Sequence, residues 1–178
     1  MLERHAGPAV LRDLEPWHAQ EFAELFQRED HDLYEWLAWE HFEDKEKSKG
    51  FLEGFAKGRG EGNRRLFGLW LDGTLVGGTL YPTVNMRSGI AEIGVFLAAP
   101  ARGQGIVTQA VEAMLDHAFD DLGMRRVEWR CSPANLPSRA IPEKLGFTME
   151  GVLRQVFQVR ENYLDLEVWS ILRDEWRA

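Results

Sequence analysis

A strand, a glycine-containing turn and a helix follow one another between residues 90 and 121, and this order most restricts what the chain can form. The run from Ile90 to Ala99 is apolar except for one glutamate and one glycine, as in a buried strand. After Gly103 and Gly105, apolar residues recur with helical spacing over residues 106–121. The sequence therefore predicts a buried strand whose connection to the next helix is made by glycines.

This glycine turn is typical of an anion site. Two glycines let the backbone approach a ligand closely, and the free amides of a first helical turn attract negative charge. We therefore predict that the turn holds a diphosphate. Neither the Gly-Lys-Ser/Thr of a P-loop nor the third glycine of a dinucleotide fingerprint is present, which disfavours ATP and NAD. The alternative is that the glycines only bring the helix close to the sheet.

The stretch Arg102-Gly103-Gln104-Gly105-Ile106-Val107 resembles the coenzyme A pyrophosphate loop of the GNAT N-acetyltransferase superfamily, Gln/Arg-x-x-Gly-x-Gly/Ala. Val107 departs mildly from that pattern. Further segments are similar to the RimJ/RimL type, which comprises ribosomal-protein N-terminal acetyltransferases. These segments are Trp36-Leu37-Ala38-Trp39, Asn135-Leu136-Pro137-Ser138, Glu143-Lys144-Leu145-Gly146-Phe147, Glu150-Gly151-Val152-Leu153-Arg154, Asn162-Tyr163-Leu164-Asp165 and residues 169–176.

The resemblance implies an α+β fold with a mixed, mostly antiparallel central sheet of about seven strands. Helices flank this sheet, and two parallel central strands splay apart to hold acetyl-CoA. The local patterns predict the following elements: a first strand at 9–14, helices near 17–27 and 44–57, hairpin arms at 65–71 and 74–81 around an Asp72-Gly73 turn, a strand at 125–131, a helix at 135–145 and two final strands.

The resemblance also implies which residues bind the cofactor, acetyl-CoA. The pantetheine arm is expected on the backbone of the central strand and the diphosphate in the glycine turn. The expected cofactor residues are Val95, Phe96, Leu97, Arg102, Gly103, Gln104, Gly105, Ile106, Val107, Thr108, Asn135 and Ser138. Arg102 is equally suited to pair with a surface carboxylate, and Lys144 and Arg139 are candidates for the ribose phosphate.

In this family the acceptor amine attacks the thioester directly, so the resemblance implies no nucleophilic side chain. Ser138 occupies the place of the family residue that contacts the departing sulfur, and it is our first catalytic candidate, as a proton donor. The alternative is a helix cap, because Asn135 or Ser138 at the start of a helix would bind its free amides. For Asn135, capping and cofactor contact are equally supported.

The general base is less obvious. RimL-like enzymes carry a glutamate where this chain has Phe157. Glu92 is the nearest replacement, because a carboxylate in an apolar central strand is costly unless it is used or paired. It would act through water. Its alternative role is to pair with a buried amide or an arginine such as Arg87, and His41 and Glu35 remain further candidates.

The kind of acceptor amine can be predicted from how much of it is neutral at pH 7. At pH 7 an α-amine is on the order of 10% neutral, whereas a lysine is under roughly 0.1% neutral. A weak base therefore favours a protein N-terminal α-amine, with small-molecule amines (antibiotics, aminoacyl nucleotides, polyamines) as the alternative. Trp36 and Trp39, three residues apart, would form an aromatic wall for the acceptor on one helical face, or a stripe in the core. A non-catalytic acyl-CoA-binding module is the alternative of another class.

Composition limits the remaining possibilities. The 178 residues are 44% hydrophobic and have no linker-like segment, which predicts one domain over residues 1–178. A formal charge of −8 disfavours nucleic-acid binding, although the acidic residues over 29–44 would attract a cationic acceptor or cover solvated helices. We expect a cytoplasmic protein without membrane spans, with no metal site and with its single cysteine, Cys131, in packing. The last hairpin has an edge on which a homodimer could form.

Overall fold

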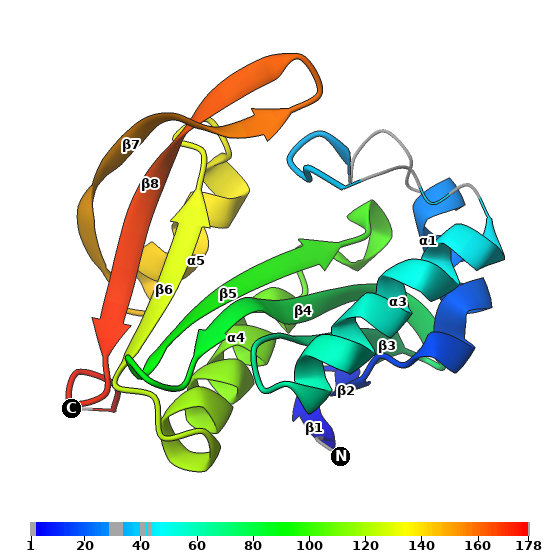
Figure 1. The fold of residues 1–178 in the computed structure, drawn as a ribbon, viewed down its shortest axis with the longest axis horizontal. Coiled ribbons are helices and arrows are strands. Elements are labelled where there is room, and N and C mark those ends of the chain that lie inside the picture. The colour runs from blue at the N-terminus through cyan, green and yellow to red at the C-terminus, as the bar shows by residue number, and fades with distance from the viewer. Residues whose placement is uncertain (1–2, 29–33, 40–41, 43, 178) are drawn as a thin grey trace.

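The computed structural model describes residues 3–28, 34–39, 42 and 44–177. Its centre is an eight-stranded sheet with the strand order β1-β2-β3-β4-β5-β6-β8-β7 (Figure 1). In chain order the elements are β1 (Glu3–Ala6), β2 (Ala9–Asp13), η1 (Pro16–His18), α1 (Ala19–Arg28), α3 (Lys45–Gly60), β3 (Arg65–Leu71), β4 (Thr74–Asn85), β5 (Ile90–Leu97), η2 (Ala99–Ala101), α4 (Ile106–Asp116), η3 (His117–Asp121), β6 (Arg126–Cys131), α5 (Leu136–Lys144), β7 (Thr148–Val159) and β8 (Asn162–Leu172).

The predicted elements are present, and the sheet has one strand more than the expected seven. The extra strand is β1, which pairs antiparallel with β2. Gly7 makes the reversal possible, because its φ of 61° lies in the left-handed region that favours glycine. The Gly7 amide also donates a hydrogen bond of 2.8 Å to Oε1 of Gln109 in α4, which ties this edge of the sheet to the helix.

The predicted parallel pair is β5 and β6, and the other strand pairs in the described chain are antiparallel. Pairing between β5 and β6 ends where Ile93 meets Trp129, although β5 continues to Leu97 and β6 to Cys131. The two strands therefore separate at their carboxyl ends, as Figure 1 shows. This confirms the expected splayed pair and opens a space in the sheet.

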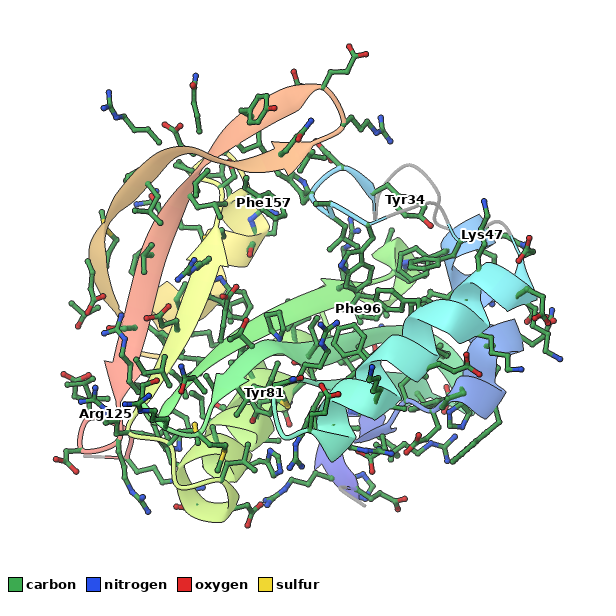
Figure 2. All side chains as sticks on the ribbon, viewed as in Figure 1. Tyr34, Lys47, Tyr81, Phe96, Arg125 and Phe157 are labelled. Carbon is green, nitrogen blue, oxygen red and sulfur yellow. The ribbon has the colours of Figure 1, made fainter. Side chains whose placement is uncertain are left out.

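Helices cover both faces of the sheet, with α4 on one face and α1 and α3 on the other. One core cluster joins α4 to inward-facing residues of β5 and β6, including Ile93, Met114 and Trp129. A second cluster joins α1 and α3 to β3 and β4, and Phe96 of β5 belongs to it. Figure 2 shows Phe96 on the α3 side of the sheet and Tyr81 near α4.

No helix in the described chain is long and apolar enough to span a membrane.

A buried histidine in the α4 core predicts acid sensitivity of the fold. The Tyr81 hydroxyl donates to the carbonyl of Met114 (2.5 Å), so Nδ1 of His117, 3.2 Å from that hydroxyl, must donate to it. Nε2 of the same ring then accepts from Arg65 at 3.4 Å. Burial, followed by the Arg65 charge, lowers the pKa of His117 to about 4.

Because the unfolded chain binds this proton near pH 6.5 and the folded chain only near pH 4, stability falls as the pH drops between these values. We expect His117 to contribute a loss of about 2 kcal/mol in the free energy of unfolding between pH 7.5 and pH 5. Urea unfolding of the wild type and of His117→Gln at both pH values measures it. An equal loss in both proteins would contradict this assignment.

Candidate active site

A cavity of about 670 Å³ lies where β5 and β6 separate. Its wall is made by the end of β5, the glycine turn, the first turn of α4, the start of α5 and the segment around Trp36. The lining residues are Glu35, Trp36, Leu37, Val95, Phe96, Leu97, Ala101, Arg102, Gly103, Gly105, Ile106, Val107, Thr108, Ala134, Asn135, Pro137, Ser138, Ile141 and Lys144. Except for Gln104, every cofactor residue expected from the sequence lies in this wall. The Gln104 side chain instead donates to the carbonyl of Pro100.

The glycine turn forms a cradle at the N-terminus of α4. Gly103 and Gly105 have φ values of 76° and 75°, which other residues adopt only with strain. Gly105 is the N-cap and supplies no capping side chain, and the residues of the first turn, 106–108, line the cavity. Together with the positive end of the helix dipole, these groups suit the diphosphate of a coenzyme A molecule.

Arg102 is held at the cavity wall by the strand that precedes it. Its Nε donates a hydrogen bond of 3.2 Å to the carbonyl of Leu97. The planar guanidinium carries further donors suited to a phosphate. This contact ties the cradle to the carboxyl end of β5, where the strand has left β6. Residues 95–97 of β5 line the cavity beyond the last pair with β6, so in the described chain the edge of β5 that faces away from β4 has no strand partner there.

At the start of α5 the structure separates the roles of Asn135 and Ser138. Asn135 is the N-cap, and its Oδ1 accepts from the backbone amide of Ser138 at 3.1 Å. The hydroxyl of Ser138 is not needed for that cap, and Ser138 lines the cavity. Its neighbour Cys131 is buried, and this burial raises the pKa of its thiol to about 11. The thiol is therefore neutral near pH 7, consistent with packing.

Glu92 does not line the cavity, and its partner is not Arg87. It lies on β5 three residues before Val95, a distance of about 10 Å along a strand. Nε of Arg130 is 3.7 Å from its Oε2. Burial raises the pKa of Glu92, and the Arg130 charge opposes that rise. The same arginine binds Glu128 at 3.0 Å, so Glu92 belongs to a row of alternating charges on this sheet face.

The two tryptophans occupy different places. Trp36 lines the cavity, whereas the ring of Trp39 packs against Phe26, Phe51 and Phe96. Residues 36–39 are irregular and not helical, so the expected shared helical face is wrong. Glu35 is exposed at the cavity wall. His41 and much of the acidic run lie outside the described residues.

Some wall residues were not expected from the sequence. Leu37, Ala101, Ala134, Pro137 and Ile141 are among them. For Ile141 a signal existed, since Ser138, Ile141 and Lys144 are spaced by three and share one side of a helix. Lys144 is in the wall, but Arg139 is not and pairs with Glu167 at 3.2 Å. Within the described ranges, no three His, Cys, Asp or Glu side chains form a metal site.

Comparison with known proteins defines the class. The profile of the acetyltransferase (GNAT) domain matches residues 10–148. The chain is 30% identical over 171 residues to the "Putative ribosomal N-acetyltransferase YdaF" of Bacillus subtilis, covering 95% of this chain and 93% of the relative. The chain therefore belongs to the GNAT acetyltransferase family, and it is an N-acetyltransferase of the RimJ/RimL-like type.

Solved structures agree with this fold. RimJ of Mycobacterium smegmatis, in complex with a CoA disulfide, superimposes with a TM-score of 0.91 at 25% identity, over 99% of this chain and 88% of that one. RimL, a ribosomal L7/L12 α-N-protein acetyltransferase in complex with coenzyme A, gives a TM-score of 0.90 at 20% identity, over 96% and 98%. The α+β fold with a splayed strand pair is thus the GNAT fold.

Proposed function

We propose that this enzyme transfers an acetyl group from acetyl-CoA directly to a primary amine, and that the acceptor is the α-amine of a protein N-terminus. One observation carries the proposal. The same cavity joins the diphosphate cradle, the unpaired edge of β5, the hydroxyl-bearing residue Ser138 and the exposed segment at Glu35 and Trp36. The cavity therefore offers one part of its wall to a long acyl donor and a chemically different part to an amine acceptor.

Each wall has a separate task. The amides at the start of α4, with Arg102, would hold the diphosphate, and the free backbone of β5 would hold the pantetheine arm. Bound acetyl-CoA supplies an activated acetyl thioester. Ser138 keeps a hydroxyl proton at the wall, where a departing thiolate needs a donor. Neither Cys131 nor any other nucleophile is required.

Glu92 is proposed as the base, acting through water, because it lies about 10 Å before the cavity wall on the same strand. Burial holds its pKa above the usual range, which makes it a better proton acceptor than an exposed carboxylate. Even so, assistance of this kind is modest. It suits an α-amine, of which on the order of 10% is already neutral at pH 7, better than a lysine.

Names of similar proteins support the acceptor. The relative from Bacillus subtilis carries the name "Putative ribosomal N-acetyltransferase YdaF", and RimL is named as an α-N-protein acetyltransferase. Both names point to acceptors on ribosomal proteins, and the second to an α-amine. We therefore place protein N-termini ahead of small-molecule amines for this chain.

Thiol release from acetyl-CoA tests the proposal, with N-terminal peptides, free amino acids, polyamines and amine antibiotics as acceptors. Turnover is expected with peptides, and an acid limb in the pH profile of kcat/KM is expected to disappear in Glu92→Gln. Glu128→Gln, on the adjacent strand, is the matched control and should keep that limb. Turnover with small amines alone would contradict a protein N-terminus as the acceptor, and a thermal shift with coenzyme A but no turnover would contradict transfer itself.

A further inference from the structure

The β7–β8 hairpin extends beyond the strand on which it packs. β6 pairs with β8 only from Glu167 to Leu172. Residues 162–166 of β8 and their partners in β7 therefore project past the carboxyl end of β6. In Figure 1 this tip arches over the open end of the splayed strands, toward the segment that follows α1.

The register places four apolar side chains of this tip on one face. Val168 pairs with Arg130, so Val168, Leu166 and Leu164 alternate onto the face that carries Arg130. Leu166 pairs with Leu153, and Leu164 pairs with Phe157. We call Leu153, Phe157, Leu164 and Leu166 the acceptor strip.

Side chains of the acceptor strip remain accessible. Leu153 is 42% exposed, and the other three are only half-buried. The helices α1 and α3 pack on β3 and β4, so among the described helices none covers this face of the hairpin. Figure 2 shows Phe157 on the side of the hairpin that faces the Tyr34 segment across the opening.

Charged side chains on the same face would orient an acceptor on the strip. Glu128 is held by two arginines, Arg126 at 2.9 Å and Arg130 at 3.0 Å. Glu92, its register partner on β5, has the longer contact of 3.7 Å with Arg130, so it is the less neutralised carboxylate of the two. Glu35 adds a further carboxylate at the cavity wall. An ammonium group is therefore attracted toward the splayed strands, while a group attached beside it meets apolar surface on the hairpin.

We propose that the acceptor strip binds the side chain adjacent to the reacting amine, so that the preferred acceptors are peptides whose first residue is large and apolar. This inference rests on the proposed function and names its substrate class. The strip is continuous with the charged row of the proposed site through Val168 and Arg130. An apolar pocket typically discriminates by roughly tenfold or more in kcat/KM for such side-chain differences.

The test uses peptides that differ only in the first residue, Leu or Phe against Ser or Gly, with kcat/KM from thiol release. The wild type is expected to prefer the apolar peptides by roughly tenfold or more. Phe157→Ser should abolish this preference without changing the KM for acetyl-CoA. Tyr163→Ser is the matched control, because Tyr163 is on the opposite face of the same hairpin and is 60% exposed, and it should keep the preference.

The possible outcomes distinguish a failure of the acceptor strip from a failure of the proposed transferase function. Equal turnover of all peptides, or a preference that survives in Phe157→Ser, would overturn the acceptor strip while the transferase stands. No turnover of any peptide by the wild type would overturn the proposed function itself. Leu164→Asn provides a second variant if Phe157→Ser unfolds, and it is expected to reduce the same preference.

Discussion

Ser138→Ala is expected to lower kcat for acetyl transfer by roughly 100-fold, within the range that positioned proton donors contribute. The reason is that the variant removes the hydroxyl of Ser138, which is the group we propose as the proton donor to the departing thiolate. The backbone amide that Asn135 binds is unchanged, so the cap of α5 and the thermal stability should be preserved. Coenzyme A affinity should stay within about threefold, since a neutral hydroxyl contributes little to the binding of so large a molecule.

Two measurements decide this prediction. Steady-state rates of thiol release with a peptide acceptor give kcat, and calorimetric titration with coenzyme A gives the affinity. Ser132→Ala is the matched control, because Ser132 accepts from the amide of Ala134 at 3.3 Å but does not line the cavity. If both serine variants kept wild-type kcat, Ser138 would have no role in the chemistry.

Gly105→Val is expected to weaken coenzyme A binding by roughly 30- to 100-fold. At a φ of 75° a β-branched residue is strained by about 2 kcal/mol or more, and the turn relieves that strain by leaving the left-handed region. The amides of the cradle then no longer converge, and each 1.4 kcal/mol lost is about tenfold in affinity. Open space around this glycine, with only Gln109 at 3.5 Å, means that the core itself is not disrupted.

The control for this prediction is Gly123→Val. Gly123 has a φ of 66° and no atom within 4 Å of an added Cβ, so it carries comparable strain outside the cavity. Both variants should lose similar thermal stability, but only Gly105→Val should lose coenzyme A affinity in a titration. Equal affinities in the two variants would show that the cradle does not bind the diphosphate.

Local sequence patterns were sufficient to predict the glycine turn of the cradle and the order of most helices and strands. Gly103 and Gly105, between an apolar run and a helical repeat, predict a turn at a helix N-terminus that a ligand can approach closely, because the reason is steric and local. The first strand of the sheet was missed because Glu3–Ala6 is short and its pairing depends on Gly7 and Gln109, which is distant in sequence.

Side-chain roles were less accessible to sequence reasoning. Trp36 and Trp39 are chemically identical, and only the irregular path of residues 36–39 sends one to the cavity and the other to the aromatic cluster. Similarly, Arg87 and Arg130 were both available to Glu92. The pairing of β5 with β6 places Arg130 beside Glu92, and no local rule contains that neighbour.

The sequence by itself determined the strand, glycine turn and helix of the cradle and the place of Ser138 at a helix start, since backbone sterics and hydrophobic period act over a few residues. The class of fold followed from the resemblance of its motifs to a known family. Only the tertiary structure decided where β5 and β6 part, which aromatic faces the cavity, and that Leu153, Phe157, Leu164 and Leu166 share an open face. The first and the last of these features depend on strand register, and the second on the irregular path of residues 36–39. Both are fixed by contacts between residues far apart in the chain.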